Sequence, residues 1–247
     1  MRVDWLEPDW PANAGVRALS TVRFGGISLA PYASLNLGDH VGDDPAAVAE
    51  NRRRLVVAAG LPAEPVWLAQ VHGTTVADLD ATPAITADAA FTRQPGRVCA
   101  ILTADCLPVL LTEESGGVVA AAHAGWRGLA GGVIEATVRA VGEPPGRLMA
   151  WLGPAIGPDH FEVGAEVREA MLREDPRASG AFTLNARGRF MADLGALARR
   201  RLEALGVSRI YGNGQCTYTD ADRYFSHRRD GTTGRQATLI WLEHAPT

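Results

Sequence analysis

The stretch GVVAAAHAGWRGLAGGVIEATVRAVG, residues 117–142, contains both kinds of element that decide the fold. Its first part is an unbroken apolar run, which is typical of a buried strand, and in its second part apolar residues recur at helical spacing. The stretch therefore predicts a strand that leads into a helix over about 126–141. His123 lies at the junction, where a histidine is either a core side chain with satisfied hydrogen bonds or part of a functional site.

The rest of the chain predicts more strands than helices. Capping residues and helical spacing predict further helices over 44–60, 165–174 and 193–206. Apolar runs bounded by turn residues predict one short strand near the N-terminus, then strands over 65–71, 74–79, 117–124, 147–153, 207–214 and 235–243, and a pair of strands over 97–112 that is interrupted at Asp105. We expect the strands over 65–71 and 74–79 to form a hairpin around His72 and Gly73. Several neighbouring strands have no helix between them, which favours an α+β or layered α/β fold with mixed sheets over a regular doubly wound fold.

Composition narrows the class of protein. The chain has 247 residues, of which 47% are hydrophobic and 21% charged, so it can bury a sizeable core, and without a linker we expect one domain over 1–247. A net charge of -4 argues against a protein that mainly coats nucleic acid. The N-terminus lacks the apolar core of a signal peptide, and we expect no membrane partner. Three cysteines do not make a disulfide framework, which favours a reducing cytoplasm.

Three apolar segments end at a residue that can bind a metal ion. These residues are His72 in AQVHGTT, Cys106 in LTADCLPV and His123 in AAHAGWRG. Two imidazoles and one thiolate suit zinc, and three protein ligands leave a fourth position open for water, as in catalytic zinc sites. Copper is also compatible with this set of ligands. No C-x-x-C or H-E-x-x-H motif ties the three residues together, so the spacing alone is weak evidence for a metal site.

Two alternatives remain for Cys106 at this point. The thiol could act as a nucleophile with one of the histidines as its base, which requires only that the thiolate lie within hydrogen-bond reach of an imidazole. The thiol could also be a small buried hydrophobic group, which is the usual fate of a free cysteine. We assign this second interpretation to Cys99, which lies inside the apolar run RVCAIL.

Seven motifs in one order resemble a known family over nearly the whole chain. They are STVRFGGIS, SLNLGDHVGDDPAAVAENR, AQVHG, TADCLPVLL, HAGWRGLAGGV, GPAIGPDHFEVGAEV and YFSHRRDGTTGRQATLIWL. Together they resemble the laccase-domain, or YfiH-like, family of purine nucleoside phosphorylases, once described as polyphenol oxidases. The resemblance implies a single domain with α/β/β layers. It also implies a zinc site of two histidines and one cysteine, which carries over onto His72, His123 and Cys106.

The resemblance further implies three activities on small molecules. They are phosphorolysis of adenosine, inosine, guanosine and methylthioadenosine, deamination of adenosine, and copper-linked oxidation of phenols. A laccase needs several copper centres and further histidines, and the remaining histidines are scattered along the chain at His40, His160, His227 and His244. We therefore expect phenol oxidation to be at most a side activity.

Deamination would need a proton shuttle in addition to the metal ion. A metal lowers the pKa of its bound water towards ~7, which would supply hydroxide for attack on the purine C6. Asp105, next to Cys106, is a candidate for the shuttle. Neighbouring strand residues point to opposite faces, so both side chains reach one pocket only if the strand breaks there. The alternative is that Asp105 is a turn residue that caps nearby backbone groups.

Phosphorolysis would need an anion pocket, and arginine suits this task. Arg127 follows His123 at a helix start between two glycines, and Arg228 follows two aromatic residues in DRYFSHRRDG. Each of them could instead be a solvated surface residue. Asn36 and Arg23 lie on the long N-terminal segment, which could fold over the metal as part of the pocket wall. Asn36 would then offer a donor and an acceptor to a purine or a sugar.

We therefore expect a cytoplasmic zinc enzyme that acts on a nucleoside or nucleotide together with phosphate, as a monomer or a small homo-oligomer. The alternative, also suggested by the family, is a hydrolase that cleaves a misincorporated amino acid from a UDP-muramyl precursor of peptidoglycan. A third possibility is a metal-binding protein without turnover. The sequence does not rank the two sets of substrates.

Overall fold

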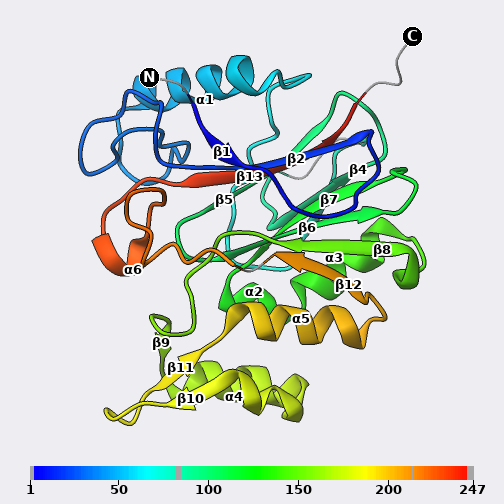
Figure 1. Ribbon diagram of the computed structural model, residues 1–247, viewed down its shortest axis with the longest axis vertical. Helices are drawn as coiled ribbons and strands as arrows, with labels where there is room; N and C mark the ends of the chain where they lie inside the picture. The colour runs from blue at the N-terminus through cyan, green and yellow to red at the C-terminus, as the bar shows by residue number, and fades with distance from the viewer. Residues whose placement is uncertain (1–2, 82–84, 213, 244–247) are drawn as a thin grey trace.

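The computed structural model describes residues 3–81, 85–212 and 214–243. Its centre consists of two sheets packed face to face (Figure 1). The larger sheet has six strands in the order β12-β8-β6-β7-β4-β3: Arg209–Gly212, Leu148–Leu152, Leu107–Glu113, Val119–Ala124, Ala89–Thr92 and Val76–Asp78. The smaller has four in the order β1-β2-β13-β5: Trp5–Leu6, Val16–Thr21, Gln236–Leu242 and Val98–Thr103. A third sheet is β10-β11-β9: Phe182–Leu184, Phe190–Ala192 and Glu162–Val163.

Helices cover the outer faces of both central sheets (Figure 1). The helix α1 (Pro45–Ala59) packs on the four-stranded sheet, whereas α2 (Trp126–Gly131), α3 (Val133–Val141) and α5 (Leu194–Ala204) lie along the six-stranded sheet. The remaining helices are α4 (Ala165–Glu174) and α6 (His227–Asp230), with short 3-10 turns at Pro145–Arg147 and Pro176–Ala181. The predicted α+β fold with layered mixed sheets is confirmed. No helix among the described residues combines the length and the apolar character that a bilayer crossing requires.

Burial on both faces explains the continuous apolar runs of the central strands. In β5, Cys99 and Ile101 point into the core between the two sheets, where they meet Leu110 of β6, while Ala100 and Leu102 face α1. Every residue of β5, β6, β7, β8 and β13 is buried. A strand covered on both sides has no solvent face, so its sequence loses the usual alternation. Cys99 is buried as predicted.

The helix predicted over 126–141 is two helices. Gly132 has φ 93 and ends α2 before α3 begins. A left-handed residue cannot continue the right-handed hydrogen-bond ladder, and glycine adopts this conformation without steric cost. The break lets α2 turn away from α3, so that the segment directly after β7 is a short helix beside the functional residues described below.

The hairpin predicted around His72 and Gly73 is wrong. The segment 65–71 makes only an isolated bridge from Val66 to Cys99, and β3 pairs in parallel with β4. His72 has φ 60, which takes the chain out of strand geometry. The backbone N–H groups of residues 71–73 donate to the buried carboxylate of Asp88. In a hairpin, carbonyl oxygens of a partner strand would accept such N–H groups instead.

Candidate metal centre

The register of two central strands brings Cys106 and His123 together. In the antiparallel pair β6 and β7, Leu107 lies opposite Ala124 and Pro108 opposite His123. Cys106 directly precedes β6 and therefore lies beside the end of β7. His72 comes from the loop before β3, which Gln70 attaches to β5 through a pair of hydrogen bonds with the backbone of Leu102, both of 2.8 Å.

The three predicted ligands form one cluster. Their donor atoms all lie within 4.8 Å of one another, and the Sγ of Cys106 is 3.9 Å from the Nε2 of His72. The two imidazole rings meet edge to face with centroids 4.7 Å apart. His123 is buried, Cys106 is half-buried and His72 is exposed, so the cluster opens to solvent on the His72 side.

A fully buried carboxylate, Asp88, holds both histidine segments. Its Oδ1 lies 2.9 Å from the Nδ1 of His123 and accepts the N–H of His72 at 2.9 Å. Its Oδ2 accepts the N–H groups of Gly73 at 2.6 Å and Val71 at 3.2 Å. Burial alone would raise the pKa of Asp88, but the hydrogen bonds from His123 and Gly73 outweigh it and lower the pKa. With its Nδ1 engaged, His123 directs its Nε2 towards Cys106.

Sequence reasoning missed Asp88. The available signal is a single carboxylate at the head of the apolar strand 88–92. Such a residue resembles an ordinary turn residue until the pairing of β4 with β7 is known. That pairing places the Asp88 carbonyl 2.7 Å from the N–H of His123, and thereby its carboxylate beside the imidazole.

The electrostatics of the cluster favour a thiolate next to an imidazolium. Burial alone would raise the pKa of the Cys106 thiol, but hydrogen bonds from His123 and His72 lower it to about 6. Burial would likewise lower the pKa of His123, but Asp88 and Cys106 raise it to about 9. A thiolate is the form of cysteine that binds metals and the form that acts as a nucleophile.

The residues present fit a metal ion such as zinc. Bond lengths of ~2.0–2.3 Å in a tetrahedral site place two ligand atoms roughly 3.5 Å apart, close to the 3.9 Å between Cys106 Sγ and His72 Nε2. The hydrogen bond of His123 to Asp88 is the carboxylate contact that metal-binding histidines commonly make. A thiolate and two oriented imidazoles therefore need only a small contraction to surround an ion.

We predict that Gly125→Ala weakens metal binding about tenfold. A Cβ at this position would lie 2.9 Å from Cys106 Sγ, 3.1 Å from His72 Cδ2 and 3.4 Å from His123 Nε2. The sulfur of Cys106 would have to move and the ring of His72 would have to give slightly, while the contact with His123 is close to an ordinary one. Zinc affinity measured by competition with a chelator checks this, and Gly146→Ala, whose Cβ would meet nothing within 4 Å, is the control. Unchanged affinity in Gly125→Ala would contradict the geometry.

A second prediction concerns the reactivity of Cys106 in metal-free protein. Because the pKa of its thiol is lowered to about 6, the thiolate is present above that pH and is lost below it. Alkylation of Cys106 by iodoacetamide should therefore be half-maximal near pH 6, and zinc should protect the thiol. Mass spectrometry of the labelled peptides measures this, with the buried Cys99 as an unreactive internal control. Half-maximal labelling near the ~8.5 of a free thiol would contradict the hydrogen-bonded pair.

The strand breaks at Asp105, but the break does not turn its carboxylate towards the cluster. Asp105 has φ 95 and is 8% exposed. Its Oδ1 accepts the hydroxyl of Thr217 at 2.7 Å, and its Oδ2 accepts the N–H of Arg228 at 2.7 Å. Both oxygens are therefore already bound to protein donors. This arrangement corresponds to the capping alternative and replaces the proton shuttle.

The structure also corrects the roles expected for Asn36 and Arg23. Asn36 is fully buried, and its amide binds the backbone of Gly38, the N–H of Arg235 and the carboxylate of Asp43. Arg23 donates to the carbonyl oxygens of Ala33 and Ala221 and lies over the ring of Phe225. Both side chains hold the N-terminal segment together, which differs from the expected contacts with a substrate. The amide of Asn36 is used within the protein, whereas the Nη2 of Arg23 has no acceptor among the described residues and its contact with a substrate stays a prediction.

Arg127 and Arg228, in contrast, line one open groove of about 400 Å³. The Arg127 guanidinium lies 4.4 Å from the ring centroid of Trp126, and that of Arg228 lies 5.2 Å from Phe161. Arg189 lines the same groove. Glu162 and Glu166 line it as well, so the groove offers cations supported on aromatic rings together with two carboxylates.

The chain is similar to known proteins over nearly its whole length. A family described as "Multi-copper polyphenol oxidoreductase laccase" matches residues 17–243. The chain is 56% identical to a purine nucleoside phosphorylase of Pseudomonas aeruginosa over 97% of its length and 98% of the relative. It is 54% identical to purine nucleoside phosphorylase YfiH of Escherichia coli, covering 96% and 98%. The crystal structure of a Neisseria meningitidis protein, 50% identical, superposes with a TM-score of 0.92 over 97% of this chain and 99% of that one.

Proposed function

The chain belongs to the multi-copper polyphenol oxidoreductase laccase family, and from that premise we propose that it is a purine nucleoside phosphorylase that requires a metal ion held by His72, Cys106 and His123. The observation that carries the proposal is the cluster of two imidazoles and one thiolate, oriented by Asp88, in a chain 56% identical to a named phosphorylase. We propose zinc as the ion, with copper as the alternative, because the same donors suit both. Adenosine, inosine, guanosine and methylthioadenosine are the proposed substrates, with deamination of adenosine as a second activity.

Zinc in this cluster would supply Lewis-acid chemistry to a substrate or to water. The chain itself supplies orientation and charge. Asp88 fixes the ring of His123, and Cys106 supplies the negative charge that balances a cation. Arg127 and Arg228 offer cationic contacts, and each guanidinium lies over an aromatic ring, Trp126 or Phe161. These two cations suit an anionic part of a substrate.

A second candidate function is favoured by the lowered pKa of Cys106. A thiolate beside an imidazolium is also the activated pair of a cysteine hydrolase, which would cleave an amide of a UDP-muramyl precursor. The two functions compete for the same sulfur, because a thiolate bound to a metal is a poor nucleophile. Zinc should therefore support the phosphorylase and inhibit the hydrolase.

Phenol oxidation remains the weakest candidate. In the described part of the chain, the group of residues close enough to hold an ion is the His72, Cys106 and His123 cluster. Elsewhere His160 stacks on Tyr218, and the Nδ1 of His227 lies 2.6 Å from the carbonyl oxygen of Gly231. His40 lies beside Asp39, and His244 lies outside the described residues.

The test combines metal content with a panel of substrates. Zinc-loaded protein is incubated with each of the four nucleosides, with and without phosphate, and with the UDP-muramyl precursor. Release of free purine base that requires both zinc and phosphate supports the proposed function. Loss of an amino acid from the precursor by metal-free protein supports the hydrolase instead. Stoichiometric zinc without turnover of any substrate would leave a metal-binding protein and overturn both.

A further inference from the structure

Arg235 precedes β13 of the four-stranded sheet, and the turn that carries Cys106 connects β5 of that sheet to β6 of the six-stranded sheet, although 129 residues separate Arg235 and Cys106 in the chain. In the antiparallel pair β13 and β5, Gln236 lies opposite Thr103. Arg235 directly precedes Gln236, so continuing this register places it across from Ala104, the residue before Asp105. The start of β13 and the turn that carries Cys106 therefore meet.

The side chain of Arg235 is held in one orientation. Its backbone N–H donates to the Oδ1 of Asn36 at 2.8 Å, and its Nη1 donates to the carbonyl oxygens of Thr233 and Gly234, both at 3.0 Å. The side chain also lies directly against Gly38, where an added Cβ would be 2.7 Å from the Arg235 Cγ. The buried Asn36 therefore fixes the backbone, and two carbonyl groups fix one end of the guanidinium.

The other end of the guanidinium is free to bind a ligand. Among the described residues, Nε and Nη2 have no hydrogen-bond acceptor, and no carboxylate forms a salt bridge with Arg235. By contrast, the half-buried Arg201 pairs with Glu135 at 3.0 Å. Burial lowers the pKa of Arg235, while the negative charges of Cys106 and Asp105 raise it to a smaller extent. Neither of these nitrogens is a buried atom, so both are accessible to an anionic ligand from solvent.

We propose that Nε and Nη2 of Arg235 bind a tetrahedral oxyanion beside the metal cluster, and that this oxyanion is the phosphate cosubstrate. The assignment rests on the proposed phosphorolysis. These two donors form the side-on fork with which arginine binds phosphate oxygens in bidentate fashion. The phosphate site is then distinct from the groove of Arg127 and Arg228, whose cations remain available to other parts of the substrate.

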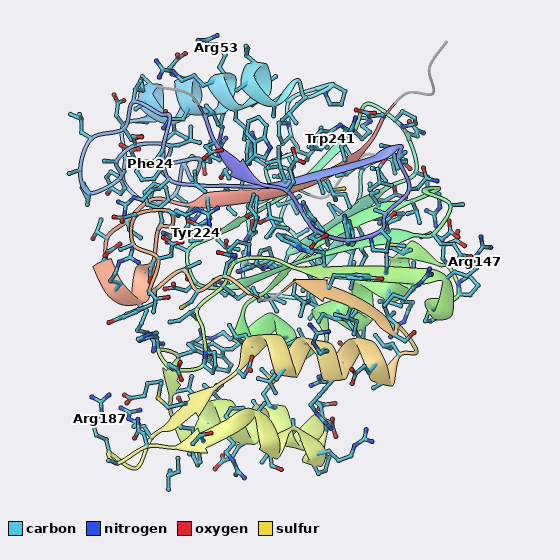
Figure 2. All side chains as sticks on the ribbon, in the orientation of Figure 1. Phe24, Arg53, Arg147, Arg187, Tyr224 and Trp241 are labelled. Carbon is cyan, nitrogen blue, oxygen red and sulfur yellow. The ribbon has the colours of Figure 1, made fainter. Side chains whose placement is uncertain are left out.

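The first experiment measures phosphorolysis by full-length, zinc-loaded Arg235→Gln and Arg235→Lys. Arg235→Gln should raise the KM for phosphate about tenfold or more, because it removes two charge-assisted hydrogen bonds, while the KM for nucleoside and the zinc content stay unchanged. The KM for phosphate of Arg235→Lys should lie between those of the wild type and Arg235→Gln, since lysine keeps the charge but lacks the two-donor geometry of the guanidinium. Arg53→Gln is the control, because Arg53 is 64% exposed on the outer side of α1 (Figure 2).

The second experiment measures binding without turnover, so that it stands even if the protein is not a phosphorylase. Calorimetric titration of zinc-loaded protein with inorganic phosphate should show binding that Arg235→Gln abolishes and Arg53→Gln retains. A parallel titration with a nucleoside monophosphate identifies the source of the oxyanion, and binding of the monophosphate alone would overturn the assignment to free phosphate. Unchanged phosphate affinity and KM in Arg235→Gln, or the same loss in Arg228→Gln instead, would overturn the role of Arg235.

Discussion

The Cys106→Ala variant is expected to contain no stoichiometric zinc and to release no purine base from any nucleoside. Cys106 supplies the anionic donor of the cluster, and its removal leaves only two imidazoles, of which that of His72 is exposed. The loss in affinity should exceed the ~100-fold that removal of an outer-shell carboxylate can cause, because a direct ligand is removed. Zinc content after desalting and base release in the presence of phosphate are the two measurements.

Chelation of the wild-type protein separates a structural from a chemical cause of this loss. Metal-free wild type should be equally inactive and should recover when zinc is added back, whereas Cys106→Ala should not recover. Cys216→Ala is the matched control, since Cys216 is also half-buried but its Sγ accepts the N–H of Gly157 instead of facing an imidazole. Full activity of Cys106→Ala without metal would remove the metal-dependent mechanism.

The Asp88→Asn variant should bind zinc about 10- to 100-fold more weakly while keeping all three ligands. The Asp88 oxygens face only N–H groups in this structure, from His123, His72, Gly73 and Val71. An amide has a single acceptor oxygen, so its NH₂ group would face donors wherever it is placed. The ring of His123 or the turn at His72 then loses its anchor, and each buried donor left unsatisfied costs about 1–3 kcal/mol of stability.

Zinc affinity and the thermal unfolding midpoint together check this expectation. Asp78→Asn is the control, because the carboxylate of Asp78 accepts the N–H of Asp80 outside the cluster. Both quantities should fall in Asp88→Asn and stay constant in Asp78→Asn. Wild-type zinc affinity in Asp88→Asn would show that the hydrogen bond to His123 does not orient the ligand.

Local errors in the sequence-based prediction arose where a side chain competes with regular backbone pairing. The run 65–71 has the composition of a strand, yet Asp88 accepts the N–H groups of residues 71–73 and His72 takes a left-handed conformation. Asp105 likewise breaks its strand but turns to Thr217 and Arg228. The composition of each segment contains no information about the partner that lies across from it.

The sequence by itself determined the central strands, the main helices and the three residues that could bind a metal, because burial periodicity and donor chemistry are local properties of the chain. Only the tertiary structure decided what surrounds those residues. Asp88 lies 16 positions from His72 and 35 from His123, and it reaches the first through the pairing of β3 with β4 and the second through the pairing of β4 with β7. The register of β13 on β5 similarly brings Arg235 to the cluster, while Asn36 turns inward to hold it. Such partners are chosen by contacts between distant segments, which depend on packing of the whole core.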